Sequence, residues 1–351
     1  MIATRLTELL GIQHPVVQAA MGYVSGPRLA AATSSAGGLG QIASATMSLA
    51  ELEGAIAETA GRTSAPFGVN LRADAPDAGE RVKLIIAGRV PVASFAQAPR
   101  PELIAALKEA GVVTVASVGA RRHAEKAAGW GIDAVIATGH EGGGHVGAVP
   151  TSLLIPQVAA AVDVPVIAAG GFYDGRGLVA ALAWGAEGIA MGTRFLLTSD
   201  SPVPDAVKRV YLAAGLDGTV VTRQVDGVPH RVLRTGMVDH LNRGGVGGLV
   251  QAVRSAAAYR EMAGVSWREM VRQGRGMRRE GGLSWGQVLM AANTPVLLRA
   301  AMVDGRTELG LMSSGQVAGL IGDLPSCAEL MGAIMRDAEA GAERIATFRS
   351  A

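Results

Sequence analysis

Val164-Pro165-Val166-Ile167-Ala168-Ala169-Gly170-Gly171-Phe172 is the stretch of sequence that decides the fold. A run of β-branched and small apolar residues ends in two glycines, and an alanine-rich segment, 177–184, follows it. An apolar run without polar alternation is typical of a strand buried on both faces. The stretch therefore predicts one βα unit of a parallel sheet, with the glycines in the turn between strand and helix.

The same alternation of strand and helix extends in both directions. Seven more strands are predicted on apolar runs, at residues 16–18, 39–42, 67–70, 90–94, 112–117, 134–137 and 188–191. Helices are predicted between them, at residues 27–36, 49–59, 78–87, 101–110, 121–130 and 153–162. Eight consecutive units favour an α/β fold closed into a (β/α)8 TIM barrel. The alternative, a doubly wound open sheet, would require a GxGxxG turn after the first strand, where the chain has Gln18-Ala19-Ala20-Met21-Gly22.

The alternating pattern stops after Phe195. Residues 201–311 contain turns and helical segments and follow the eighth strand. They therefore predict a mainly helical insertion at the carboxyl-terminal mouth of the barrel, which would act as a lid or a substrate wall. The predicted barrel domain comprises residues 1–200 and 312–351 and includes a closing helix over residues 327–336.

Composition narrows the class of protein. The chain of 351 residues is 49% hydrophobic and 4% aromatic, and its net charge is +2, which argues against a nucleic-acid partner. No apolar run reaches the roughly 18 residues needed to span a bilayer, and the first residues lack the apolar core of a signal peptide. We therefore expect a cytoplasmic protein with no membrane contact. The single cysteine, Cys327, excludes an internal disulfide and a cysteine-cluster metal site.

Two glycine turns follow the seventh and eighth predicted strands. Gly170 and Gly171 end one strand, and Gly192 and Thr193 end the other. In α/β barrels a phosphate is commonly held at this pair of strands by backbone N–H groups and a helix N-terminus. One such turn would be explained as an ordinary tight turn. Two turns at this pair of strands favour a phosphate-bearing ligand.

The loop Gly139-His140-Glu141-Gly142-Gly143-Gly144-His145-Val146-Gly147 follows the sixth predicted strand. Its glycines expose backbone amides to a flat ligand, and His145 would be held beside that ligand. Imidazole titrates near neutrality, so His145 can take a proton from a substrate carbon or donate one to a developing oxyanion. A metal site of His140, Glu141 and His145 is the minority alternative, because the spacing is not the His-Glu-x-x-His of a helix. We predict no metal, and His140 is equally consistent with function and with loop hydrogen bonding.

Small or polar residues end three other predicted strands. Ala20, Met21, Gly22 and Tyr23 follow the first strand, whereas Asn70 ends the third and Ser117 the fifth. Each residue alone is a weak signal. The carboxyl ends of the strands meet at one mouth of a barrel, so together they predict a polar rim around one cavity.

In combination these motifs resemble the nitronate monooxygenase (2-nitropropane dioxygenase) family, which includes flavin-type enoyl-acyl-carrier-protein reductases. The resemblance covers essentially the whole chain, and residues 14–22, 36–40, 66–70, 141–145, 168–171 and 191–195 carry it. It implies a barrel that binds FMN without covalent attachment, with His145 on the family's catalytic histidine. The residues expected to contact FMN lie at strand ends and in the glycine loop: Ala20, Met21, Gly22, Asn70, Ser117, Gly143, Gly144, Gly170, Gly171, Gly192 and Thr193.

Within the family the closer likeness is to an actinobacterial subgroup of steroid catabolism, carried by residues 43–47, 71–75, 205–209, 291–295 and 323–327. It implies an FMN-dependent oxidoreductase that dehydrogenates or reduces a cyclic acyl-CoA. Two alternatives stay open, a nitronate monooxygenase that uses O2 and a non-catalytic flavin-binding protein.

The predicted partner is a small-molecule substrate, for which a CoA thioester is the candidate. A homodimer is left open as the oligomeric state. The candidate substrate contacts are His140, Tyr23, Arg275 and Arg278, the two arginines on the basis of charge alone.

Overall fold

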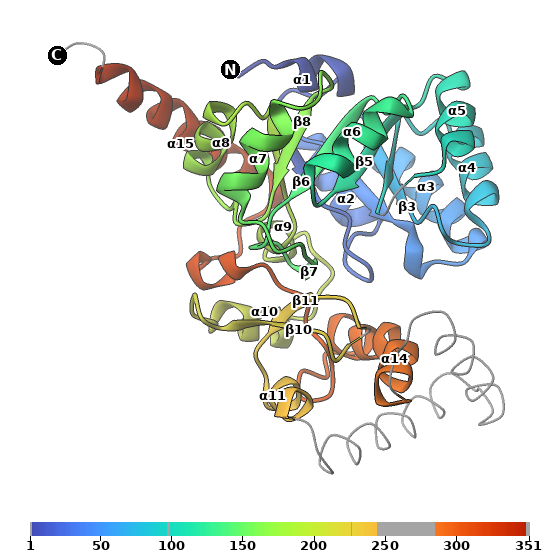
Figure 1. The fold of residues 1–351 in the computed structure, drawn as a ribbon, viewed down its shortest axis with the longest axis vertical. Coiled ribbons are helices and arrows are strands. Elements are labelled where there is room, and N and C mark those ends of the chain that lie inside the picture. The colour runs from blue at the N-terminus through green and yellow to red at the C-terminus, as the bar shows by residue number, and fades with distance from the viewer. Residues whose placement is uncertain (1, 97–98, 226, 244–284, 349–351) are drawn as a thin grey trace. The chain divides into compact units, whose positions relative to one another are not determined.

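The structure, a computed structural model, describes residues 2–96, 99–225, 227–243 and 285–348 (Figure 1). The chain divides into two compact units. The barrel unit comprises Met1–Gly142, Val146–Pro202 and Leu320–Ala351, and the insertion unit comprises Gly143–His145 and Val203–Gly319. The sequence-based boundaries place the insertion at residues 201–311. The insertion unit of the structure also includes residues 312–319 and the tripeptide Gly143–His145, whereas residues 201–202 belong to the barrel unit.

A ring of parallel strands forms the centre of the barrel unit. Its strands are β1 (Val16–Gln18), β2 (Gly40–Ala43), β3 (Phe67–Leu71), β4 (Val92–Phe95), β5 (Val113–Val118), β6 (Ala134–Thr138), β8 (Val166–Ala169) and β9 (Gly188–Met191). Their order is β1-β9-β8-β6-β5-β4-β3-β2. A parallel bridge between Val17 and Leu39 joins the two ends, and the amide of Gln18 donates to the Leu39 carbonyl at 2.9 Å. The predicted (β/α)8 barrel is therefore confirmed, and the open-sheet alternative is wrong.

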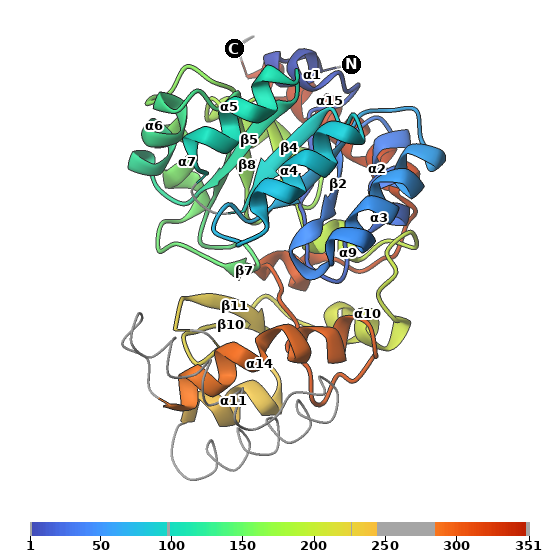
Figure 2. The ribbon, with the colours of Figure 1, turned by 90° about the vertical axis from the view of Figure 1, so that its right-hand side faces the viewer.

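Helices follow the barrel strands and cover their outer face (Figure 2). They are α2 (Pro27–Ser35), α3 (Leu49–Arg62), α4 (Ala78–Ala87), α5 (Pro101–Glu109), α6 (Arg121–Gly129), α7 (Thr151–Ala159), α8 (Gly175–Ala183) and α9 (Thr193–Leu196). Local sequence fixes several starts: Ser48 and Glu51 form a capping box on α3, and proline occupies the first turn of α2 and α5. The closing helix α15 (Cys327–Thr347) is longer than predicted and packs against α8 and α2.

Apolar side chains of the core close the amino-terminal end of the barrel. A short helix that the sequence pattern did not indicate, α1 (Arg5–Leu10), precedes β1. Its Leu6 and Leu10 pack in one cluster with interior strand residues such as Val17, Val92 and Ile167. The amino-terminal end of the barrel is therefore plugged by apolar side chains, whereas the small and polar residues gather where the strands end.

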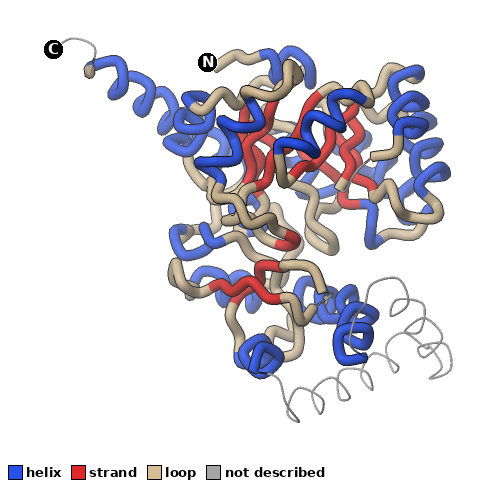
Figure 3. The backbone as a smooth tube through the Cα atoms, viewed as in Figure 1, coloured by secondary structure: helices blue, strands red, loops and turns tan. Residues whose placement is uncertain are grey.

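The insertion unit contains a small antiparallel sheet as well as helices (Figure 3). Its strands are β7 (Gly144–His145), β10 (Thr219–Thr222) and β11 (His230–Leu233), in the order β10-β11-β7. Its helices are α10 (Asp205–Leu212), α11 (Gly236–Arg243) and α14 (Trp285–Met302). Val225, Val232, Val238 and Leu311 belong to its apolar core. The insertion contains helices, as expected, but its four-residue strands β10 and β11 were missed because runs this short give almost no periodic signal.

Candidate functional site

Two glycine turns lie side by side at the carboxyl ends of β8 and β9, which pair in register at Ala169 and Ala190. Gly170 and Gly171 have φ angles of 99° and 84°, a left-handed conformation that residues with a side chain rarely adopt. A Cβ on Gly170 would also lie 3.0 Å from the hydroxyl oxygen of Thr151. In the second turn Gly192 is the N-cap of α9, so the start of a helix faces the same edge. The glycine-only backbone of the first turn and the helix start in the second turn together suit a phosphate group.

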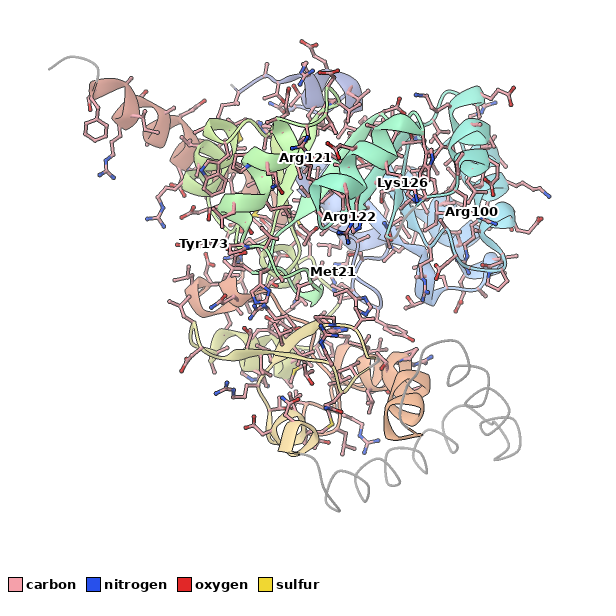
Figure 4. The ribbon with its side chains drawn as sticks, in the orientation of Figure 1. Met21, Arg100, Arg121, Arg122, Lys126 and Tyr173 are labelled. Atoms are coloured by element: carbon pink, nitrogen blue, oxygen red, sulfur yellow. The ribbon has the colours of Figure 1, made fainter. Side chains whose placement is uncertain are left out.

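The loop after β1 lies next to the second turn, because β1 pairs with β9 at Gln18 and Met191. Met21 is labelled in Figure 4, and its sulfur lies 3.4 Å from the position of a Cβ built on Gly192. The amide of Met21 donates to the Ser25 hydroxyl at 2.9 Å. Tyr23 has a φ of 64°, an uncommon value for a non-glycine residue. The loop is therefore held in a defined shape beside the second turn.

A chain of hydrogen bonds runs among the polar side chains inside the barrel. The Asn70 amide donates to the Ser94 hydroxyl at 2.9 Å, and that hydroxyl donates to Gln41 Oε1 at 2.5 Å. The Gln41 backbone amide donates to Gln18 Oε1 at 3.0 Å, and Gln18 Nε2 donates to Ser25 at 2.8 Å. The network ties Asn70 to the loop after β1. Of the five residues, only Asn70 was among the predicted site residues, although a glutamine in a buried apolar strand is a usable signal.

Glu141 and His140 brace the glycine loop. A Glu141 carboxylate oxygen accepts from the Thr151 amide at 2.9 Å and lies 2.8 Å from its hydroxyl, which also lies 2.9 Å from the Gly170 carbonyl oxygen. His140 is half-buried, and its Nδ1 lies 2.7 Å from the Gly147 carbonyl oxygen, so this nitrogen carries the proton and donates. Among the residues that the structure describes, no group of three His, Cys, Asp or Glu side chains is placed to hold a metal ion.

His145 lies in β7 of the insertion unit, opposite His230 of β11. The two ring centroids are 4.8 Å apart and the ring planes meet at 64°. His230 is 5% exposed, and its Nε2 lies 2.8 Å from the hydroxyl oxygen of Ser313. His145 itself is exposed. A buried, hydrogen-bonded histidine therefore supports the ring of an accessible one.

The glycines before His145 have separate structural reasons. Gly144 has a φ of 75°, in the left-handed region. A Cβ on Gly143 would lie 2.7 Å from the amide nitrogen of Gly315 and 2.7 Å from the carbonyl carbon of Ser314. Only glycine therefore lets the backbone at residues 314–315 run this close to β7.

The predicted site residues fall into three groups. Those at strand ends lie at the carboxyl edge of the barrel unit: Ala20, Met21, Gly22, Tyr23, Asn70, Ser117, Gly170, Gly171, Gly192 and Thr193. Gly143, Gly144 and His145 belong to the insertion unit. Arg275 and Arg278 lie outside the described residues. His140 joins the first group, because it also belongs to the barrel unit. His230, Ser313 and the partners of Asn70 in the polar network were not predicted.

The barrel unit is a (β/α)8 barrel with a phosphate-type pair of turns, and the insertion unit carries an exposed histidine. The chain belongs to the nitronate monooxygenase family, whose sequence model matches residues 3–84 and 78–337. It is an oxidoreductase of a family of flavin-dependent enzymes. In the part of the chain that the structure describes, no helix has the length and apolar character needed to cross a membrane.

Two relatives match nearly the whole chain. The (3aS,4S,5R,7aS)-5-hydroxy-7a-methyl-1-oxo-octahydro-1H-indene-4-carboxyl-CoA dehydrogenase of Mycobacterium tuberculosis is 61% identical over 96% of both chains. The Rhodococcus jostii protein of the same name is 58% identical, also over 96% of both. Among solved structures, FabK from Thermotoga maritima superimposes with a TM-score of 0.82 at 36% identity, covering 99% of this chain and 100% of FabK.

Proposed function

We propose that the protein is an FMN-dependent dehydrogenase of a bicyclic acyl-CoA from steroid-ring degradation. The observation that carries this proposal is the 61% and 58% identity, over 96% of the chain, to two dehydrogenases named for one such thioester. Coverage of this extent includes the insertion as well as the barrel. Loops and insertions after barrel strands set substrate choice in this fold, so similarity there bears on the substrate as well as on the chemistry.

The named thioester carries its carboxyl-CoA group on ring carbon 4 and a hydroxyl on the neighbouring carbon 5. Carbon 5 is therefore β to the thioester carbonyl, and the hydrogen on carbon 4 is the acidic α-hydrogen. Dehydrogenation removes a hydride from a ring carbon and a proton from the neighbouring oxygen or carbon. A bound flavin supplies the two-electron acceptor for the hydride. The protein must supply a base for the proton and a means of orienting the ring.

The barrel residues would bind the cofactor, and their geometry favours FMN over a flavin without phosphate. We propose that the phosphate lies on two turns: Gly170–Gly171, where positive φ angles disfavour side chains, and Gly192–Thr193, at the start of α9. The ring would lie near Ala20, Met21 and Gly22, which the hydrogen bond to Ser25 holds in place. The remaining contacts proposed from the barrel unit are the polar side chains of Asn70 and Ser117.

His145 would be the acid–base group. Its side chain is exposed, so it is accessible to a substrate, and imidazole can accept a proton near neutral pH. In this proposal it takes the proton that leaves with the hydride, or it donates to the thioester carbonyl oxygen. Gly143 and Gly144 would present backbone beside it. His140 and Tyr23 remain proposed substrate contacts, and His140 also has the loop-bracing hydrogen bond described above.

An anaerobic reduction experiment tests the proposal. Purified protein should carry FMN, and mixing it without oxygen with the 5-hydroxy bicyclic acyl-CoA should bleach the flavin absorbance and give a product two mass units lighter. Propionate 3-nitronate and nitroethane serve as matched reductants for the nitronate monooxygenase alternative. Rapid bleaching by the nitronate and none by the thioester would replace the dehydrogenase with that activity. A protein that takes up no flavin would overturn both.

A further inference from the structure

A cavity of about 660 Å³ in the insertion unit has no role in the site described above. It opens between α10, the turn at residues 215–218 and the end of β11. Its volume is within the range of small-molecule sites. Arg209 and Arg234 contribute two cationic side chains to its lining, and Asp217 contributes one carboxylate. Neither arginine has an ion pair among the residues that the structure describes, so the cavity presents a net positive charge to an anion.

The rest of the lining is apolar and has small side chains. Ala206, Val210 and Ala213 come from one face of α10, at spacings of four and three residues, and Leu233 ends β11. At the turn, the Gly218 amide donates to the Gly215 carbonyl at 2.9 Å, and a Cβ on Gly218 would lie 2.8 Å from that oxygen. Backbone atoms therefore form the side of the cavity at this turn. An apolar surface of short side chains with cations at its border suits a flat ring that carries phosphate.

Strand β11 connects this cavity to His145, the proposed acid–base group. Its first residue, His230, contacts His145, and its last, Leu233, lines the cavity next to Arg234. At about 3.3 Å per residue, His230 and Arg234 are roughly 13 Å apart along the strand. The arm of CoA between its sulfur and its diphosphate has the bond count of about four extended residues, which spans roughly 15 Å. A thioester that reacts at His145 can therefore reach the cavity with its nucleotide end.

Two exposed cations of α6 on the barrel unit, Arg121 and Lys126, are less suitable (Figure 4). The Arg121 guanidinium pairs with Glu125 at 2.7 Å, and the Lys126 ammonium lies 4.8 Å from the centre of the Trp130 ring. These two side chains already have partners, whereas Arg209 and Arg234 both face one cavity.

We propose that this cavity binds the adenosine 3′,5′-bisphosphate end of the CoA thioester. Arg209 and Arg234 hold the phosphates, and the adenine lies on the face formed by Ala206, Val210 and Ala213. The inference rests on the proposed function for the choice of CoA. A dinucleotide carries the same adenosine-phosphate chemistry, so the experiment must separate the two sources.

Calorimetric titration of the FMN-loaded full-length protein with adenosine 3′,5′-bisphosphate tests the proposal. Arg209→Gln and Arg234→Gln should each weaken binding about tenfold, since a charge-assisted hydrogen bond contributes on that scale. Arg223→Gln is the matched control, because Arg223 is an exposed arginine of the same unit outside the cavity. Binding should also weaken as salt is raised, since phosphates and guanidinium groups are screened. The titration requires no turnover, so its result is independent of whether the thioester is oxidised.

Three outcomes decide the matter. Binding that both cavity variants weaken and the control does not supports the proposal. Equal binding by all variants overturns it. Tighter binding of adenosine 2′,5′-bisphosphate, the corresponding end of NADP, with the same dependence on Arg209 and Arg234, would overturn the CoA assignment and make the cavity a dinucleotide site.

Discussion

The rings of His145 and His230 meet edge to face, with their centroids 4.8 Å apart, at a pair of residues that are directly opposite in an antiparallel sheet. The register fixes the backbone of His145, and the buried ring of His230, 2.8 Å from Ser313, limits the orientations of its side chain. A proton-transfer group works only when it is held within hydrogen-bond reach of the atom it serves. The pair is therefore a device for orienting the proposed acid–base group.

Replacing His145 tests its role directly. His145→Ala should keep the FMN spectrum, since the proposed phosphate turns are in the barrel unit, and should lower kcat by roughly 10²–10⁴-fold, the usual contribution of general acid–base catalysis. Stopped-flow reduction by the acyl-CoA measures this. His123→Ala is the control, because His123 is exposed on α6. An unchanged rate in His145→Ala would remove this residue from the mechanism.

Replacing the supporting histidine should give a different kinetic result. His230→Phe keeps an aromatic ring against His145 and loses the contact with Ser313, so we expect kcat to fall about tenfold with little change in KM. The pH dependence of kcat should also shift, because the environment of His145 changes. Ser313→Ala should show the same trend more weakly. If His230→Phe lowers both kcat and the melting temperature but leaves the pH profile of kcat unchanged, the role of His230 is purely structural.

The phosphate turn makes a prediction about the cofactor. Gly170→Ala places a Cβ 3.0 Å from Thr151 on a residue with a φ of 99°, a conformation that costs roughly 1–2 kcal/mol for an L-residue. Relief of this strain changes the shape of the turn, so FMN affinity should fall about tenfold or more in a fluorescence titration. Gly79→Ala is the control, since a Cβ there meets no atom within 4 Å. Equal affinities in the two variants would place the phosphate elsewhere.

The strands and most helices of the barrel were predictable because each is specified by a local apolar pattern. The run at residues 164–169, for example, indicates β8 within two residues of its start. The support of His145 was not predictable, because His230 and Ser313 are distant in sequence and meet it only through sheet pairing and a side-chain contact. Helix α1 was missed for a related reason: its six residues acquire their role only by plugging the folded barrel.

Gly143 also shows what the sequence can and cannot predict. A glycine run in a loop indicates close backbone approach, and that much can be read from the sequence. The segment that packs against Gly143 cannot be read from the sequence, since the backbone at Ser314 and Gly315 comes from a distant part of the chain. Motifs with a fixed chemical meaning, such as the paired turns at Gly170 and Gly192, are therefore easier to place than the residues that support them.

The single cysteine makes a prediction about reactivity. Cys327 is fully buried at the start of α15, and burial raises the pKa of its thiol to about 11. The thiolate is the reactive form, so iodoacetamide at pH 8 should leave the native protein unmodified and should alkylate Cys327 once the chain is unfolded. Intact-protein mass spectrometry measures both. Rapid alkylation of the native protein would show that α15 opens locally.

A buried nitrogen at the closed end of the barrel predicts how stability depends on pH. Nδ1 of His14 is buried without a hydrogen-bond partner among the described residues, and burial lowers the pKa of this imidazole below its ordinary 6.5. The unfolded chain therefore binds the proton more readily than the folded protein, so a contribution to stability that is complete above pH 6.5 is lost as the pH falls below it. Urea unfolding at pH 7.5 and pH 5.5 should show the decrease, and His14→Gln should reduce its size. His123→Gln, which changes an exposed histidine, should keep the dependence of the unaltered protein, and an equal effect of the two substitutions would contradict the assignment to His14.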